Sequence, residues 1–171
     1  WVNIPNVKAI WINSPCNPSG EVISADWLTD IVAAARRIGA VVLSDECYAL
    51  MDWRSVRRNT AASSAPAASA SAASVPAAPV AESNGPASDT AFSLSATPCA
   101  LNPHVCEGSA AGILVLYSLS KQSNMAGYRT ALIAGDYRLV KEMAEYRKQI
   151  GQIIPGPVQA AMAAGLKDTA A

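Results

Sequence analysis

Three short apolar runs constrain the fold of this chain most strongly, because each is long enough for one buried strand and no more. They cover residues 8–12, 40–44 and 112–117. Between the first two runs, Ser24 can cap a helix whose apolar residues recur with helical period, and Gly39 can end it. Apolar strands joined by a helix are typical of a parallel sheet that is covered on both faces. The first third of the chain therefore predicts a β-α-β unit.

The part of the chain after the third run continues this alternation. Residues 129–134 predict a further strand, and Asp136 can cap a helix that ends near Gly151. Pro157 suits the first turn of a final helix. The whole pattern predicts an α/β fold of three layers, in which a mostly parallel sheet has helices on both faces.

A stretch of different composition interrupts the alternation. Residues 59–88 consist mainly of Ala, Ser and Pro, with almost no charge, no aromatic side chain and no periodicity. The prolines break any long helix, so the composition predicts a mobile surface linker. We interpret residues 56–110 as an insertion into a single domain, which the two segments 1–55 and 111–171 form together.

Composition and charge narrow the class of protein. A chain of 171 residues with 51% hydrophobic side chains can bury the core of one domain. Thirteen basic residues balance thirteen acidic ones, which favours a small-molecule partner over nucleic acid or an anionic membrane. No apolar stretch approaches the ~20 residues that span a bilayer, and we expect a cytoplasmic location. The four cysteines lack paired spacing and His104 is the single histidine, so we expect no metal site.

Polar clusters follow the apolar runs at the points where the strands would end. They cover residues 17–20, 45–48 and 118–129. Ligands of open α/β sheets bind just beyond the carboxyl ends of the strands, so these clusters supply the site candidates. Lys121 is the most informative candidate, because a lysine beside small hydroxyl residues and Arg129 suits covalent chemistry next to an anion.

The clusters together contain the groups that one cofactor needs. Pyridoxal phosphate requires a lysine for a Schiff base, a carboxylate for its ring nitrogen, donors for its phenolic oxygen and a site for its phosphate. The motifs Asn17-Pro18-Ser19-Gly20, Asp45-Glu46-Cys47-Tyr48 and Ser118-Leu119-Ser120-Lys121, the last followed by Gly127 and Arg129, resemble those of fold type I aminotransferases of class I and II. The resemblance covers all the chain except the linker. It implies that the chain forms part of the large cofactor-binding domain.

The resemblance implies a role for each motif residue that would face the cofactor ring. Lys121 would form the Schiff base and later act as the base, and Asp45 would pair with the ring nitrogen. Tyr48 and Asn17 would bond the phenolic oxygen. The peptide bond before Pro18 is often cis in this family, which an X–Pro bond permits at low cost.

The same resemblance implies a phosphate site made of hydroxyl groups and a guanidinium. Its members would be Ser118, Ser120 and Arg129. Arginine suits the role because its planar fork can bind two oxygens at once. We expect Glu46 to be a solvated or structural acid, and Cys16 and Cys47 to line the pocket without a redox role.

Three longer runs are similar to one subgroup, the N-succinyldiaminopimelate aminotransferases. They are residues 44–48, 117–129 and 154–161. The similarity implies glutamate as amino donor, an oxo acid of lysine and diaminopimelate biosynthesis as acceptor, and a homodimer. The sequence lacks the earlier phosphate loop and the small C-terminal domain of such enzymes. We therefore expect this chain by itself to bind cofactor weakly and not to turn over.

Two alternatives remain open at the level of sequence. One is different chemistry on the same cofactor, such as β-elimination from a sulfur-containing amino acid. The other is a non-catalytic, aminotransferase-like sensing domain of a regulator, which would need a DNA-binding segment before Trp1. The balanced charge of the chain does not separate these readings.

Overall fold

The computed structural model describes residues 1–51 and 97–167. The low-complexity stretch 59–88 lies outside these ranges. Four strands form the sheet of the described part, in the order of their labels: β1 (Ala9–Asn13), β2 (Val41–Asp45), β3 (Ile113–Tyr117) and β4 (Leu132–Gly135). The first three strands are parallel, and β4 runs antiparallel to β3. The mostly parallel sheet that the apolar runs predict is confirmed.

The two longest helices begin and end at the residues that the sequence indicates. Helix α1 covers Ala25–Ile38, with the Ser24 hydroxyl accepting from the Trp27 N–H and Gly39 in the left-handed conformation at its end. Helix α5 covers Tyr137–Gln149 and is capped by Asp136.

Asp136 also ties helix α5 to the sheet. Its second carboxylate oxygen accepts a 2.9 Å hydrogen bond from the N–H of Gly112, at the start of β3. The hydrogen bonds from Gly112 and from the N–H of Arg138 hold the pKa of Asp136 below its usual value. One carboxylate therefore fixes the start of α5 against the start of β3.

Shorter helical turns complete the described part. These are η1 (Ala49–Met51), α3 (Pro103–Cys106), α4 (Leu119–Gln122), η3 (Ala126–Tyr128) and the longer α6 (Gly156–Lys167). Among the helices of the described ranges, none is long and apolar enough to cross a membrane.

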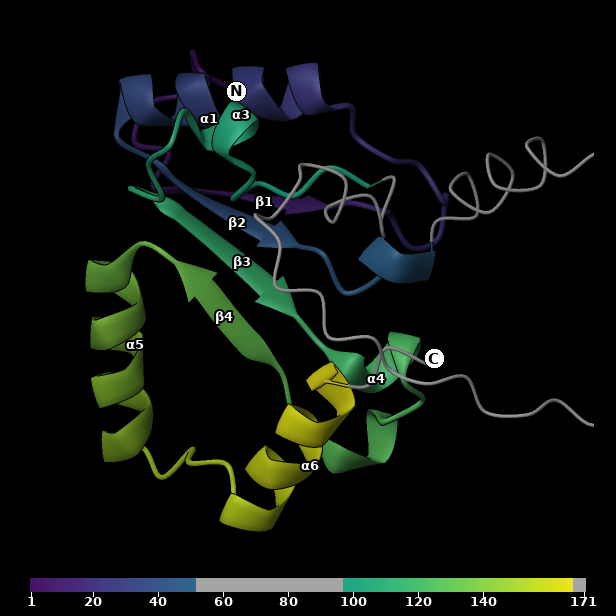
Figure 1. Cartoon of the computed structure of the whole chain (residues 1–171). Helices are drawn as coiled ribbons and strands as arrows, with labels where there is room; N and C mark the ends of the chain where they lie inside the picture. The colour runs from purple at the N-terminus through teal and green to yellow at the C-terminus, as the bar shows by residue number, and fades with distance from the viewer. Residues whose placement is uncertain (52–96, 168–171) are drawn as a thin grey trace, which may run out of the picture.

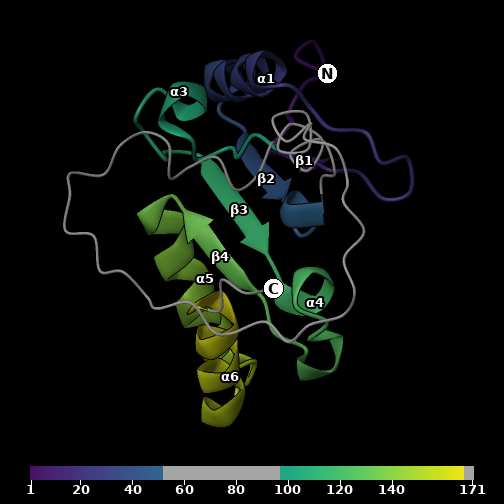
Figure 2. The same cartoon turned by 45° about the vertical axis from the view of Figure 1, so that its right-hand side comes forward.

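The helices lie on both sides of the sheet, as the three-layer prediction requires. Helices α1 and α3 lie above the sheet in Figure 1, and α5 and α6 lie below it. The view in Figure 2 keeps the same separation. A buried apolar cluster fills the space between α1, α3 and the sheet: Leu28, Val32, Ala35, Ala40, Val42, Ala100, Val105, Cys106, Ile113 and Val115. No residue of α5 is buried, so the described core lies mainly on the α1 side.

Part of the stretch interpreted as an insertion packs into this core. Residues 97–110 belong to the proposed insertion 56–110, yet Ala100 and Val105 are buried in the cluster between α1 and the sheet. Arg36 of α1 holds the same stretch, because its guanidinium donates to the carbonyl oxygens of Cys106 at 3.2 Å and Ser109 at 2.5 Å.

Two local features differ from the sequence expectation. Lys121 lies in the short helix α4 instead of a loop, because the Ser118 hydroxyl caps the turn by accepting from the N–H of Ser120. The strand expected at 129–134 begins only at Leu132, since η3 and the left-handed Arg129, with φ of 52°, precede it.

Candidate active site

The strand register brings the polar clusters to one edge of the sheet. Asn13 at the end of β1 is paired with Asp45 at the end of β2, and Asp45 is paired with Leu116 near the end of β3. The side-chain amide of Asn13 donates to the carbonyl oxygen of Asp45 at 3.2 Å. Parallel strands therefore deliver the segments that follow them to a common surface.

Asn17 and Tyr48 meet across this edge. The side-chain amide of Asn17 donates to the Tyr48 hydroxyl at 3.2 Å, and the N–H of Asn17 donates to the Asn13 side-chain oxygen at 2.9 Å. The peptide bonds before Pro15 and Pro18 are both cis, which confirms the expectation for Pro18. A turn after β1 and a turn after β2 thus present an amide and a phenol side by side.

Lys121 approaches the same pair of residues from the third strand. Its Nζ lies 5.8 Å from the centre of the Tyr48 ring, within the range of a cation–π contact. The side chain is exposed, so its amine is accessible to a ligand. Lys121, Tyr48 and Asn17 therefore gather at one place although they follow three different strands.

Asp45 and Lys121 both act on the thiol of Cys47. Burial, followed by the hydrogen bond and negative charge of Asp45, raises the pKa of this thiol to about 12, although the backbone of Ser118 and the charge of Lys121 act in the opposite direction. The N–H of Cys47 also donates to Asp45 Oδ1 at 3.2 Å. Both the carboxylate and the amine therefore act on one thiol that the raised pKa keeps protonated at neutral pH.

Ser118 and Ser120 form a small hydroxyl pair at the start of α4. Their hydroxyl oxygens lie 2.7 Å apart, and Ser118 donates to the carbonyl oxygen of Thr130 at 3.0 Å. A hydroxyl has one proton to donate, so that of Ser118 is committed to Thr130 in this conformation. The Ser120 hydroxyl is then the donor in the 2.7 Å contact, and a phosphate oxygen could accept its proton by replacing Ser118 as the acceptor.

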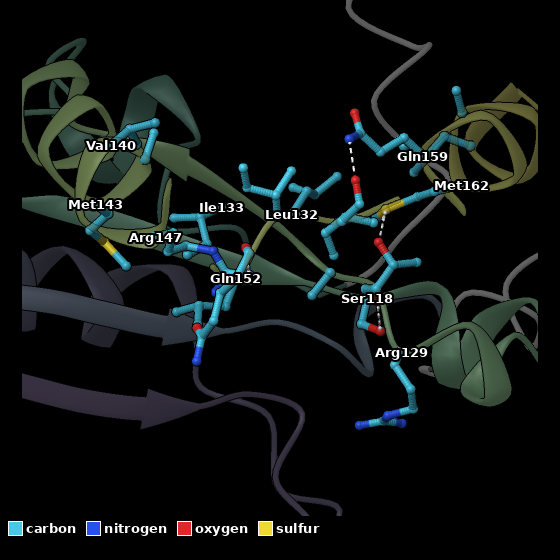
Figure 3. A pocket seen from close by; sticks show the side chains of 18 of the residues that line it. Ser118, Arg129, Leu132, Ile133, Val140, Met143, Arg147, Gln152, Gln159 and Met162 are labelled. Carbon is cyan, nitrogen blue, oxygen red and sulfur yellow. Dashed lines mark hydrogen bonds between the residues drawn. The ribbon is translucent and has the colours of Figure 1, made fainter. Parts of the chain in front are cut away.

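Arg129 lies beyond the hydroxyl pair and is exposed. One of its terminal nitrogens donates to the carbonyl oxygen of Ala126 at 2.9 Å. Figure 3 shows Arg129 and Ser118 at the same end of the cleft that α5 and α6 border. The guanidinium keeps further donors available, because it carries five in total.

That cleft includes one part of the predicted site and excludes the rest. It has a volume of about 1010 Å³ and lies under β4, between α5 and α6. Its wall is mostly apolar and includes Leu132, Ile133, Val140, Met143, Ile154 and Met162. Ser118, Ser120 and Arg129 line it, whereas Lys121, Asp45, Tyr48 and Asn17 do not. We place the candidate site at the carboxyl edge of the sheet, because Lys121, Tyr48 and Asn17 gather there. At this edge, Asn17 and Tyr48 border a smaller hollow of about 400 Å³.

The groups at the sheet edge fit pyridoxal phosphate by their chemistry. An accessible amine lies beside a phenol that already accepts from an amide, and the Asp45 carboxylate lies in the same turn as that phenol, where it accepts from the N–H of Cys47. A hydroxyl pair and a guanidinium with unused donors follow along the chain. Covalent attachment, ring-nitrogen pairing and phenolic-oxygen bonding each have a suitable group at the sheet edge, and phosphate binding has suitable groups in Ser118, Ser120 and Arg129, which line the neighbouring cleft.

Sequence reasoning missed several partners of these residues. Thr130, which accepts from Ser118, and Ala100, which donates to Glu46 at 2.8 Å, carry no motif or periodic signal. Glu46 itself is buried rather than solvated, with 5% of its surface exposed. The only sequence signal for a role of Glu46 in the site is its position between Asp45 and Tyr48.

Comparison with known proteins shows the family of the chain. The family model for aminotransferases of class I and II matches residues 3–171. A 4-dedimethylamino-4-oxo-anhydrotetracycline transaminase of Streptomyces rimosus is 37% identical over 164 residues, which are 96% of this chain and 34% of that protein. A Mycobacterium tuberculosis protein named as an aminotransferase is 35% identical over 162 residues, 94% of this chain and 29% of that protein. The chain thus spans about a third of the length of these relatives.

Solved structures show the same fold. An aminotransferase of Neisseria meningitidis superposes with a TM-score of 0.61 at 25% identity, over 95% of this chain and 32% of that one. The aminotransferase AspB of Helicobacter pylori gives a TM-score of 0.62 at 24% identity, over 95% and 33% of the two chains. The chain belongs to the class I and II aminotransferase family, whose members use pyridoxal 5'-phosphate.

Proposed function

We propose that this chain forms the cofactor-binding part of a pyridoxal phosphate-dependent aminotransferase, which transfers an amino group between an amino acid and an oxo acid. The observation that carries the proposal is the meeting of Lys121, Tyr48 and Asn17 at the carboxyl edge of the sheet. An accessible lysine next to a hydrogen-bonded phenol has no role in packing. The family of the chain supports the same reading.

Each residue of the site has a defined task in the proposal. Lys121 Nζ attaches the cofactor, and Asp45 accepts a hydrogen bond from the protonated ring nitrogen. Tyr48 and Asn17 bond the phenolic oxygen. Two hydroxyls and a guanidinium bind the phosphate: Ser120, Arg129 and, once its bond to the Thr130 carbonyl opens, Ser118.

The chemistry of the step is divided between the cofactor and the protein. Pyridoxal phosphate, when bound, supplies a ring that withdraws electrons from the substrate Cα. The negative charge of Asp45 favours the protonated ring nitrogen on which that withdrawal depends. Lys121 Nζ, once released by the incoming amino acid, takes the proton from the substrate Cα. Its Nζ lies 5.8 Å from the centre of the Tyr48 ring, whose hydroxyl would bond the phenolic oxygen of the cofactor.

Borohydride reduction followed by peptide mapping tests the assignment of Lys121. In the protein expressed from its complete reading frame, we expect the reduced cofactor on Lys121 and on no other lysine. Lys121→Ala is expected to abolish transamination while cofactor still binds noncovalently. Lys141→Ala, an exposed lysine of α5, serves as the matched control and keeps full activity. Near-normal turnover by Lys121→Ala would contradict the proposal.

We propose N-succinyl-2-amino-6-oxopimelate as the acceptor and glutamate as the donor, in lysine and diaminopimelate biosynthesis. Residues 44–48, 117–129 and 154–161 support this substrate by their similarity to that subgroup. A cytoplasmic homodimer is part of the same proposal. Glutamate-dependent amination of that oxo acid is the direct assay, and release of pyruvate and ammonia from a sulfur-containing amino acid would instead indicate a lyase.

A second candidate substrate comes from the Streptomyces relative. Its name describes amination of a ketone on a tetracycline precursor, and it shares 37% identity with this chain. A ketone on a polycyclic aromatic compound is therefore the alternative acceptor. The same glutamate-dependent assay separates the two, because only one of the acceptors would support formation of 2-oxoglutarate.

A further inference from the structure

Glu46 is a buried acid that the proposed chemistry does not use. Its side chain lies between two residues of the candidate site in sequence, yet only 5% of its surface is exposed. Burying a carboxylate is costly unless its oxygens receive hydrogen bonds. The partners of Glu46 therefore indicate what the residue does.

Three groups surround the Glu46 carboxylate, and two of them lie far along the chain. Oε1 accepts from the hydroxyl of Ser44 at 2.9 Å and from the N–H of Ala100 at 2.8 Å, 54 positions away. Both bonds are buried. The third group is the thiol of Cys99, whose pKa is raised to about 12 by burial and then by the charge and hydrogen bond of Glu46. The carboxylate thus anchors the stretch 97–101 to the end of β2.

The backbone of Glu46 is fixed at the same time. Its N–H donates to the carbonyl oxygen of Leu116 in β3 at 2.9 Å, and its own carbonyl oxygen accepts from Ala49 at 3.0 Å. The backbone of Glu46 therefore fixes the turn that contains Asp45, Cys47 and Tyr48. Because the backbone N–H and carbonyl of Glu46 are both hydrogen-bonded, we expect a change in its side chain to alter the positions of Asp45 and Tyr48.

We propose that Glu46 is a positioning residue that couples the docking of residues 97–101 to cofactor binding at the Asp45–Tyr48 turn. The coupling rests on the proposed function, because it takes pyridoxal phosphate as the ligand of that turn. When the stretch 97–101 is docked, the turn is held in the conformation that binds the cofactor ring. When the cofactor binds, it stabilises the docked stretch by the same amount, since linkage is reciprocal.

Variants at Glu46 can separate the effect of the length of the side chain from the effect of its negative charge. Glu46→Ala removes the acceptor, and Glu46→Asp keeps the charge but withdraws the carboxylate from Ala100 by one methylene. Glu46→Gln keeps an oxygen at the same reach and loses the charge. Glu142→Ala, an exposed acid on α5, is the matched control. All are made in the protein expressed from its complete reading frame.

Three quantities are measured for each variant. They are the dissociation constant for pyridoxal phosphate by absorbance titration, the exchange rate of the Ala100 amide, and the rate of Cys99 alkylation by iodoacetamide. The Val32 amide in the core of α1 serves as the internal reference for global opening. A purely structural defect would accelerate both amides together.

We expect the alanine and aspartate variants to weaken cofactor binding about tenfold and to speed Ala100 exchange and Cys99 alkylation by about tenfold or more, with Val32 unchanged. The glutamine variant is expected within about threefold of the unaltered protein. Added pyridoxal phosphate should slow Ala100 exchange in the unaltered protein. If Glu46→Ala does not fold, the aspartate and glutamine variants decide the question.

Two results would overturn the inference. One is an unchanged cofactor affinity in Glu46→Asp together with faster Ala100 exchange, which would leave Glu46 as an anchor without coupling. The other is unchanged Ala100 exchange in both Glu46→Ala and Glu46→Asp, which would remove the anchor itself. Failure of the unaltered protein to bind pyridoxal phosphate is a different result, because it refutes the proposed function and the coupling together.

Discussion

The side-chain amide of Asn17 donates a 3.2 Å hydrogen bond to the hydroxyl of Tyr48, 31 positions later in the chain. Asn17 is in turn held by Asn13, whose side-chain oxygen accepts from the Asn17 N–H at 2.9 Å. The two parallel strands β1 and β2 therefore create the contact, because they end at the same edge of the sheet. Two groups that the proposal gives to the phenolic oxygen of the cofactor are already in hydrogen-bond contact.

This contact predicts that Asn17 and Tyr48 act as a unit in cofactor binding. Asn17→Ala and Tyr48→Phe are each expected to raise the dissociation constant of pyridoxal phosphate by about 3-fold to 10-fold, the value of one hydrogen bond. The double variant should lose less than the sum of the two changes. Absorbance titration of all four proteins measures this, with Lys141→Ala as control. Strictly additive losses would show that the pair is independent.

A second prediction concerns the stability of the Ser118 turn. Ser118→Ala removes the cap of α4 and leaves the carbonyl of the buried Thr130 without the 3.0 Å bond from this hydroxyl. We expect the free energy of unfolding to fall by about 1–3 kcal/mol. Urea unfolding measures the change. Thr29→Ala, which removes an exposed hydroxyl that bonds within α1, should cost much less.

Gly135 carries a third prediction, at the close approach of β4 to β3. Its φ is 139°, and a Cβ at this position would overlap the carbonyl oxygen of Ile113 and lie 2.9 Å from the carbonyl carbon. Both atoms belong to backbone that cannot move aside cheaply. Gly135→Ala should therefore cost about 3 kcal/mol or more of unfolding free energy.

The matched change for Gly135 is Gly156→Ala, at the start of α6. A Cβ there meets no atom within 4 Å, and its backbone needs no positive φ. Thermal unfolding of both variants side by side is the measurement. Equal melting temperatures for the two would contradict the close contact between the strands.

The alkaline stability of the protein depends on two partly buried thiols, Cys47 and Cys99. Burial, followed by the charges of Glu46 and Asp45, raises the pKa of Cys99 and Cys47 from 9.0 to about 12, and burial raises the pKa of Tyr117 in the same direction. Unfolded thiols lose their protons near pH 9.0, whereas the folded ones keep them to about 12. The stabilisation is complete below pH 9.0 and is lost as the pH rises toward 12.

Urea unfolding at neutral pH and again above pH 9.0 measures this loss. We expect the free energy of unfolding to be level up to pH 9.0 and to decline beyond it. Cys99→Ala should make the decline shallower, because it removes one of the shifted groups. A stability that rises between pH 9.0 and 12 would contradict the assigned direction.

Capping signals and apolar runs predicted most of the fold. Ser24, Gly39 and Asp136 mark helix ends in the sequence, and they cap helices in the structure because their side chains or conformations satisfy the terminal backbone groups. The strand starting at Leu132 was less predictable. The expected strand begins at Arg129, but Arg129 takes the left-handed conformation at the end of η3, so regular pairing with β3 begins only at Leu132.

From the sequence, contacts of the site could be predicted only for residues that belong to a recognisable motif. Lys121, Tyr48 and Asn17 stand at strand ends, and parallel pairing brings strand ends together whatever the loop length. The bonds from Ser118 to Thr130 and from Ala100 to Glu46 join residues that are 12 and 54 positions apart, so they depend on the path of the chain between them. Such bonds leave no period in the sequence, so only the three-dimensional arrangement shows them.

The last prediction separates the phosphate of the cofactor from its ring. Arg129 donates one bond to the Ala126 carbonyl, is otherwise exposed, and lines the same cleft as Ser118 and Ser120. Arg129→Lys keeps the charge but loses the planar fork, and we expect it to weaken pyridoxal phosphate binding by about tenfold. Binding of pyridoxal, which has no phosphate, should stay the same. Absorbance titration with both compounds gives the two constants, and an equal loss for both would place Arg129 outside the phosphate site.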